Sequence, residues 1–214
     1  MRSQAKMISY GLAYGMEAFG LSQRLGVGVG QAGEILDAYA VRGHRCVLDV
    51  GGGDGTFLRA LAARAPEAQL MLFDLPGVAA QAESAFAAAG LAAKARVVPG
   101  DFSRDALPTG ADLITFVRVL HDHDDPRVER MLRAAYEALP PGGRLLVAEP
   151  LAGTAGAGRM GDAYFGVYLW AMGSGRPRTA AELTDMLRAA GFRRIRRRPT
   201  RIPLQTSVLV AERG

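Results

Sequence analysis

The chain has 214 residues, of which 49% are hydrophobic and 22% charged, and it carries a formal net charge of +5 at pH 7. This composition is ordinary for a soluble globular protein of one domain, and no apolar run is long enough to cross a bilayer. Cys46 is the only cysteine, which excludes an internal disulfide and a cysteine metal cluster.

The opening segment, residues 1–40, has the pattern of helices in an irregular, glycine-containing stretch. Apolar residues recur at helical spacing over 31–39, but the segment does not have the pattern of a complete domain. We therefore expect a helical lead-in to a domain of residues 41–214. The charged first residues are not followed by the apolar core of a signal peptide, and we expect a cytoplasmic location.

The strongest local pattern is a short strand, a glycine-rich turn and the start of a helix. Residues 46–50 form the apolar run of a buried parallel strand, and helical spacing begins at Thr56. Four glycines lie between them and allow backbone angles that side chains forbid. This arrangement presents backbone N–H groups to a nucleotide-like ligand at the carboxyl end of a sheet.

The spacing of the turn separates it from other nucleotide-binding turns. Thr56 stands where the nicotinamide pattern needs a small residue, and the lysine of an ATP-binding phosphate loop is absent. Asp49 precedes the turn, where a carboxylate would repel a pyrophosphate but suit a sulfonium or α-ammonium group. Asp74 ends the next apolar run, where a ribose-binding acid belongs. The alternative, a glycine turn without a ligand, is less favoured because Asp74 is so placed.

Strands and helices alternate along the rest of the chain, which predicts a mostly parallel sheet covered on both faces. Pro126 suits the first turn of one helix, and Thr179 suits the N-cap of another. The predicted helices span 78–89, 127–139 and 180–190, and the further predicted strands span 70–74, 96–99, 111–119, 144–149, 192–199 and 204–211.

Polar side chains lie at or just after the carboxyl ends of five predicted strands. Because parallel strands end at one rim of a sheet, where ligands bind, we expect these side chains to form a site. They are Asp49, Asp74, Asp101, His121 and Glu149.

Six arginines fall within residues 193–201. A solvated strand and its flank is the favoured interpretation, and an anionic membrane surface or nucleic acid are the alternatives. No nucleic-acid motif accompanies the cluster, so we expect no nucleic-acid partner.

Several separated motifs together resemble the catalytic domain of the S-adenosylmethionine-dependent O-methyltransferases of the caffeate/hydroxyindole type. The resemblance covers roughly residues 31–213, and 173–179 with the arginine-rich end is most similar to the bacterial hydroxyneurosporene/demethylspheroidene branch. The motifs lie, in order, at residues 48–53, 73–76, 100–102, 120–125, 141–150 and 186–192.

The resemblance implies an α/β, Rossmann-like class I fold with a seven-stranded, mostly parallel sheet and an antiparallel last strand. It implies S-adenosylmethionine as cofactor, a small hydroxylated acceptor and no metal ion. Longer members are homodimers through an N-terminal helical domain, for which this chain lacks room. We therefore expect a fragment or a truncated gene product, with residues 1–40 as a remnant of that domain.

The resemblance also assigns roles to residues. His121 is the catalytic base, Glu149 orients it, and Asp122 lies beside it in the same motif. Asp74 binds the ribose hydroxyls, and Asp101 and Phe102 flank the adenine. The full set expected at the cofactor is Asp49, Gly51, Gly53, Asp74, Leu75, Asp101, Phe102 and Arg118.

The chemistry of methyl transfer agrees with a histidine base. The acceptor oxygen must be aligned for in-line displacement and must lose its proton, which histidine can accept near neutral pH. The alternative for His121 is a helix-entry residue that bonds backbone. His123 follows two residues later, and we expect it at the surface, facing away from His121.

Two positions depart from the plant pattern. Pro177 replaces a further glutamate, and Val117 replaces a lysine near the adenine, with Arg118 adjacent. A hydroxylated carotenoid is the expected acceptor, and a small phenolic or polyketide, or an inactive cofactor-binding module, are the alternatives. The aromatic and methionine side chains of 160–172 suit a long apolar substrate wall or plain packing, and the arginines suit peripheral contact with a carotenoid-bearing membrane.

Overall fold

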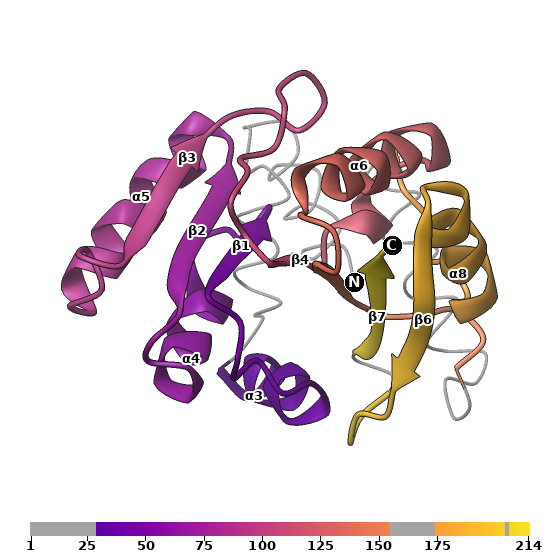
Figure 1. The fold of residues 1–214 in the computed structure, drawn as a ribbon, viewed down its shortest axis with the longest axis horizontal. Helices are drawn as coiled ribbons and strands as arrows, with labels where there is room; N and C mark the ends of the chain where they lie inside the picture. Colours follow the sequence, from indigo (N-terminus) through magenta and orange to yellow (C-terminus); the bar gives the residue numbers. More distant parts are fainter. Residues whose placement is uncertain (1–28, 155–173, 204–205) are drawn as a thin grey trace, which may run out of the picture.

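A computed structural model describes residues 29–154, 174–203 and 206–214 of the chain. Within these residues, seven strands form one sheet, and helices pack on both of its faces (Figure 1). The strands are β1 (Cys46–Val50), β2 (Gln69–Asp74), β3 (Ala95–Pro99), β4 (Leu113–Val117), β5 (Arg144–Glu149), β6 (Phe192–Arg198) and β7 (Ser207–Arg213). The helices are α3 (Val29–Ala38), α4 (Thr56–Arg64), α5 (Pro76–Ala88), the 3-10 turn η1 (Leu120–Asp122), α6 (Asp125–Ala138) and α8 (Ala180–Ala189).

The sheet order is β3-β2-β1-β4-β5-β7-β6. The first five of these strands pair in parallel, and β7 is antiparallel to both β5 and β6. The predicted seven-stranded sheet with an antiparallel last strand is therefore confirmed. The direction of winding reverses between β1 and β4, the switch point at which open α/β sheets bind ligands beyond the carboxyl ends of their strands.

Two hydrophobic clusters fill the space between the sheet and its helices. Side chains of β5 alternate between them: Leu145 and Val147 pack under α6 and α8, whereas Leu146 and Ala148 pack under α3, α4 and α5. Figure 1 shows α3 and α4 on one side of the strands and α6 and α8 on the other. Burial on both faces explains why these strands read as continuous apolar runs.

Several predicted boundaries shift by a few residues. The strands at 46–50 and 144–149 form as predicted, whereas β4 is shorter than the predicted 111–119. Asp112 lies just before β4, where its carboxylate accepts hydrogen bonds from the N–H groups of Arg45 and Cys46. Helix α5 begins at Pro76, because proline suits the first helical turn, where its missing N–H has no intrahelical partner.

Two expectations fall on residues outside the described part of the chain: the helices within residues 1–28, and the apolar stretch 160–172. Within the described ranges, no helix is long and apolar enough to cross a membrane. Helix α3, the first in the described residues, contributes Ala32, Ile35 and Leu36 to the buried cluster that it shares with α4.

Candidate functional site

The turn after β1 is folded around the carboxylate of Asp74 at the end of β2. Its Oδ2 accepts a hydrogen bond from the Gly53 N–H at 2.9 Å, and its Oδ1 accepts one from the Leu75 N–H at 2.7 Å. Burial raises the pKa of Asp74, and these two bonds oppose that rise. Each carboxylate oxygen has a second lone pair, so this half-buried group can still accept hydrogen bonds from a ligand.

Asp49 lies within β1 and is 1% exposed. Its Oδ1 accepts a hydrogen bond from Thr115 Oγ1 at 2.6 Å, whereas its Oδ2 is buried without a partner among the described residues. Burial raises the pKa of Asp49 to about 7. The charge of Asp74 also raises this pKa, whereas the hydrogen bond from Thr115 lowers it. Because an unpartnered buried carboxylate oxygen is costly, a cationic or hydrogen-bond-donating ligand would stabilise this point.

Two glycines of the turn leave room for its close packing. A Cβ at Gly52 would lie 2.6 Å from Oδ2 of Asp49, and one at Gly51, whose φ is +70°, would lie 2.9 Å from Cγ2 of Val119. Side chains at these positions would push the turn away from Asp49 and from the residues that lead into η1. The residues predicted to bind the cofactor at the ends of β1 and β2 therefore lie close together around this turn.

Asp101 and Phe102 follow β3. The Ser103 N–H donates to Asp101 Oδ1 at 2.8 Å and is the main reason that the pKa of Asp101 is lowered. The Phe102 ring lies edge-on to the His123 ring, 5.1 Å between centroids. His123 is half-buried, and burial lowers its pKa to about 4. The expected surface position of His123 is wrong, because the loop after β3 packs against the turn after β4.

His121 and Glu149 form the buried pair at the centre of the site. His121 is 5% and Glu149 2% exposed, and 2.5 Å separates His121 Nδ1 from Glu149 Oε2. The other oxygen, Oε1, accepts hydrogen bonds from the N–H groups of Val119 and Leu120 at 2.9 and 2.7 Å. Burial alone would lower the pKa of His121, but the charge and hydrogen bond of Glu149 raise it overall.

Asp122 lies on the opposite side of the imidazole, with its Oδ1 3.3 Å from His121 Nε2. Burial raises the pKa of Asp122, the charges of His121 and Arg118 lower it, and the charge of Glu149 raises it. Arg118 has a φ of 57°, and its N–H donates to the Ala148 carbonyl at 2.9 Å. This left-handed residue turns the chain out of β4 and into η1, which carries His121.

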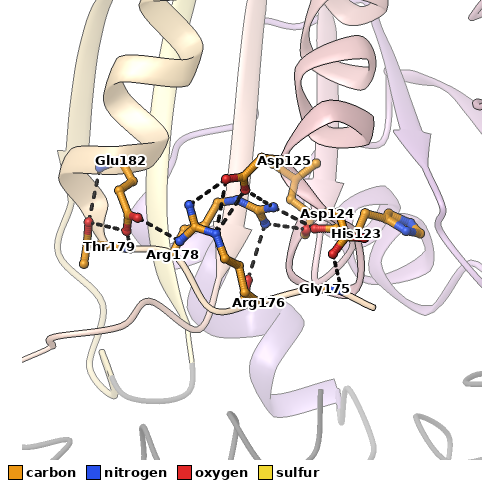
Figure 2. Close-up of polar contacts among 9 residues, drawn as sticks. His123, Asp124, Asp125, Gly175, Arg176, Arg178, Thr179 and Glu182 are labelled. Atoms are coloured by element: carbon orange, nitrogen blue, oxygen red, sulfur yellow. Dashed lines mark hydrogen bonds and ion pairs between the residues drawn. The ribbon is translucent and has the colours of Figure 1, made fainter. Parts of the chain in front are cut away.

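The sequence patterns missed a buried arginine beside this turn. Arg178 is 2% exposed and donates to the carbonyl of Leu120 in η1. It also donates to the His123 carbonyl and to the carboxylate of Asp125 (Figure 2). No local pattern marks Arg178 as buried, because its closest acceptors lie more than 50 residues earlier in the chain. No group of three or more His, Cys, Asp or Glu in the described ranges could hold a metal ion.

Comparisons with known proteins identify the family to which the chain is similar. The O-methyltransferase domain family matches residues 20–193. The demethylspheroidene O-methyltransferase of Rhodobacter capsulatus is 45% identical over 183 residues, which are 86% of this chain and 45% of that protein. The structure of the mitomycin 7-O-methyltransferase MmcR superposes with a TM-score of 0.80 at 30% identity, covering 87% of this chain and 54% of that one.

Human N-acetylserotonin methyltransferase, solved in complex with SAM, superposes with a TM-score of 0.76 at 27% identity, covering 86% of this chain and 52% of that one. The chain thus spans about half the length of the curated relatives it matches. The family match covers more than half of the chain, and its fold is that of the solved relatives. The chain therefore belongs to the O-methyltransferase domain family.

Proposed function

We propose that the chain is the catalytic part of an S-adenosylmethionine-dependent O-methyltransferase that methylates a hydroxyl group. One observation carries the proposal: the buried His121–Glu149 pair stands at the same sheet rim as the turn formed by Gly53 and Asp74. A base for the acceptor and a binding turn for a cationic nucleoside thus lie at adjacent strand ends. The family match and the relatives named above support the same reaction class.

The residues at the rim fit S-adenosylmethionine. Asp74 has free lone pairs for the two ribose hydroxyls, and the unpartnered Oδ2 of Asp49 offers negative charge toward the cationic methionine end. Gly51 and Gly53 keep the backbone of the turn open to close approach, and Leu75 is exposed beside Asp74. When bound, S-adenosylmethionine supplies an activated methyl group on a sulfonium. We further propose that Asp101, Phe102 and Arg118 line the same cofactor.

His121 takes the acceptor's proton in this proposal. Because the Glu149 carboxylate can only accept, the hydrogen of the neutral imidazole lies on Nδ1, and Nε2 carries the lone pair that takes the acceptor's proton. Glu149 stabilises the imidazolium that forms, and Asp122, 3.3 Å from Nε2, adds a second negative charge. The two acids therefore make proton transfer to His121 more favourable.

The test compares the wild-type chain with His121→Ala in two measurements. S-adenosylmethionine affinity should be unchanged, because the bonds of Asp74 to Gly53 and Leu75 do not involve the imidazole, whereas methyl transfer should fall by about 100-fold or more. A second candidate is a cofactor-binding module without activity, since the chain spans about half the length of the curated relatives and the activity of a whole relative stays a proposal here. That candidate is supported if the wild-type chain binds S-adenosylmethionine yet transfers no methyl group to any hydroxycarotenoid, phenolic or polyketide acceptor.

A hydroxylated carotenoid is the first proposed acceptor, and a small phenolic or polyketide is the second. The Rhodobacter capsulatus relative is named for demethylspheroidene, whereas the two solved relatives are named for mitomycin and N-acetylserotonin. The higher identity to the first relative supports a carotenoid. Transfer of labelled methyl to a hydroxycarotenoid in detergent, compared with transfer to phenols, decides between the two classes.

We propose that the chain works in the cytoplasm, in peripheral contact with an anionic membrane. The support is the edge strand β6, along which Arg193, Arg194, Arg196 and Arg197 are exposed. Only Arg194 has an acidic partner on the neighbouring strand, Glu212 at 2.9 Å. Vesicles with anionic lipid should co-sediment the chain, and glutamine at Arg193 and Arg196 should weaken this. Equal sedimentation with neutral vesicles would exclude the contact.

The homodimer that the resemblance implies for longer members is also a proposal here. The curated relatives are about twice as long as the region that they share with this chain, which leaves length in them for a helical domain. Sedimentation equilibrium of the 214-residue chain measures its state directly. A monomer would agree with a dimer interface in that domain, and a dimer would require an interface within the 214 residues.

A further inference from the structure

Arg178 is among the largest fully buried side chains of the described residues, although arginine is almost never buried without partners. Its side chain is 1% exposed and precedes Thr179, the N-cap of α8. Burial of a guanidinium is unfavourable unless its N–H groups find acceptors. The acceptors of Arg178 therefore indicate what the residue does.

Apart from the Arg176 carbonyl, 3.4 Å from Nη1, those acceptors surround the turn that carries His121. Nη1 of Arg178 donates to the Leu120 carbonyl at 2.8 Å, and Nη2 donates to the His123 carbonyl at 2.7 Å. Nε and Nη2 donate to Oδ1 of Asp125 at 2.9 and 2.7 Å. Figure 2 shows the guanidinium between Asp125, at the start of α6, and the chain at His123. One planar group thus binds carbonyl oxygens on both sides of His121.

The neighbouring residues 174–178, which we call the strap, follow the same turn. Ser174 Oγ donates to the Asp122 carbonyl at 3.3 Å, and the Gly175 N–H donates to Asp124 Oδ1 at 3.0 Å. Gly175 has a φ of +87°, and a Cβ there would lie against the His121 carbonyl and 2.7 Å from the Asp122 carbonyl carbon. The strap therefore lies directly on η1 and leaves no space for a side chain at 175.

The strap and Glu149 hold opposite backbone groups of the turn. Glu149 accepts from the N–H groups of Val119 and Leu120, at the start of the turn. Arg178 donates to the carbonyls of Leu120 and His123, the first and last residues of the turn at 120–123. A short 3-10 turn has few internal hydrogen bonds, so its position depends on such outside partners.

We propose that Arg178 is a positioning residue that fixes the turn at residues 120–123, so that the His121 imidazole stays against Glu149. The meaning of this for catalysis rests on the proposed function, but the positioning itself is a property of the chain alone. Arg178 acts through the backbone carbonyls of Leu120 and His123. Its removal should therefore release His121 without removing any group of the site.

The test observes His121 by nuclear magnetic resonance in the chain without ligands. With three histidines in the chain, ¹⁵N labelling and a His121→Gln spectrum identify the Nδ1–H signal. In wild type this proton should appear far downfield, because it bridges to Glu149. In Arg178→Met the signal should be lost, and the pKa of His121 should fall as the influence of Glu149 weakens; Asp122 and Arg118 remain beside the ring.

The matched control is Arg176→Met. Arg176 binds the same Asp125 carboxylate, with Nη2 2.9 Å from Oδ2, and also Glu182, but its side chain donates to no carbonyl of the turn. The control should keep both the downfield signal and the wild-type pKa of His121. Equal loss in the two variants would show that the Asp125 ion pairs matter and would overturn the specific role of Arg178.

Arg178→Lys keeps the charge and is the second test variant if Arg178→Met does not fold. A lysine ammonium is a point donor and cannot reach both carbonyls and Asp125 as the planar fork does, so it should also weaken the signal. A folded Arg178→Lys or Arg178→Met chain with unchanged signal and pKa refutes the proposal. If methyl transfer is measurable, kcat should fall about 100-fold with unchanged cofactor affinity. Wild type without methyl transfer would count against the proposed function only, since the resonance comparison needs no turnover.

Discussion

Glu149 Oε2 lies 2.5 Å from Nδ1 of His121, and both side chains are almost fully buried. The pair depends on sheet register, because β4 and β5 are parallel neighbours in which Val117 is opposite Ala148. Glu149 thus ends β5 beside the point where the chain leaves β4, and its second oxygen binds the N–H groups of that exit. The register of the sheet therefore sets the position of the His121 imidazole.

The first prediction concerns the pH dependence of methyl transfer. The pKa of His121 is raised above 6.5, so the neutral base forms, and the rate rises, only as pH increases through that raised value. Glu149→Gln removes the charge that raises the pKa of His121, so the rising limb should move to lower pH while the plateau falls about 100-fold. A pH–rate profile measures both, with Glu83→Gln on the surface of α5 as control. If the rising limb of the profile does not move in Glu149→Gln, Glu149 does not control the pKa of the catalytic base.

The second prediction concerns stability without ligand. Burial raises the pKa of Asp49 from 3.8 to about 7, so the contribution of this group is fully present below pH 3.8 and is lost as pH rises to 7. Asp49→Asn should therefore match wild type near pH 4 and exceed it at pH 8, by at most about 4 kcal/mol. Urea unfolding at several pH values measures this, with Asp185→Asn as an exposed control. A constant difference across the range would be inconsistent with a charged, unpartnered Asp49.

The third prediction compares two glycines of similar backbone conformation. Gly55 has a φ of +77° and Gly90 one of +70°, but a Cβ at Gly55 would lie 2.6 Å from the Phe86 ring, whereas one at Gly90 meets open space. Gly90→Ala should cost about 1–2 kcal/mol from the left-handed backbone alone. Gly55→Ala should cost a further 1–3 kcal/mol or so from overpacking. Thermal unfolding of both variants measures the difference, and equal losses would rule out the contact.

The fourth prediction concerns the start of α8. Thr179 and Glu182 form a reciprocal capping box, and the Thr179 N–H is the largest cause that lowers the pKa of Glu182 to about 2. Thr179→Ala should cost about 1 kcal/mol, compared with little for Thr184→Ala within the helix. Because the pKa of Glu182 is lowered, its contribution is present above pH 4.5 and is lost as pH falls through 2. Denaturant unfolding of Glu182→Gln should therefore differ from wild type at pH 7 and converge with it in acid.

Local sequence patterns predict those strands and helices whose signal lies in neighbouring residues. The strands at 46–50 and 144–149 are continuous apolar runs, and Thr179 with Glu182 is a recognisable cap, so these elements form as predicted. The end of β4 was missed because Arg118 adopts a left-handed conformation that no residue type nearby requires. The five polar side chains do lie at or just after the ends of neighbouring parallel strands, so the rim of the sheet can be predicted from the sequence. The roles of the individual residues stay predictions.

The errors at the site come from contacts between distant segments. His123 was expected at the surface, but Phe102 covers it from a loop that only the sheet brings alongside. Arg178 was not singled out, because arginine is usually exposed and its acceptors, Leu120 and His123, are 58 and 55 residues away. Such packing depends on tertiary structure, which hydropathy and spacing do not encode.

The most direct measurement is a calorimetric titration of the 214-residue chain with S-adenosylmethionine, for wild type and for Asp74→Asn. Asp74 anchors the turn through Gly53 and offers lone pairs for the ribose, so we predict binding by wild type and at least about a tenfold weaker affinity in the variant. Circular dichroism confirms that both chains are folded. Absence of binding by folded wild type, or equal binding by Asp74→Asn, would contradict the assignment of this rim as the cofactor site.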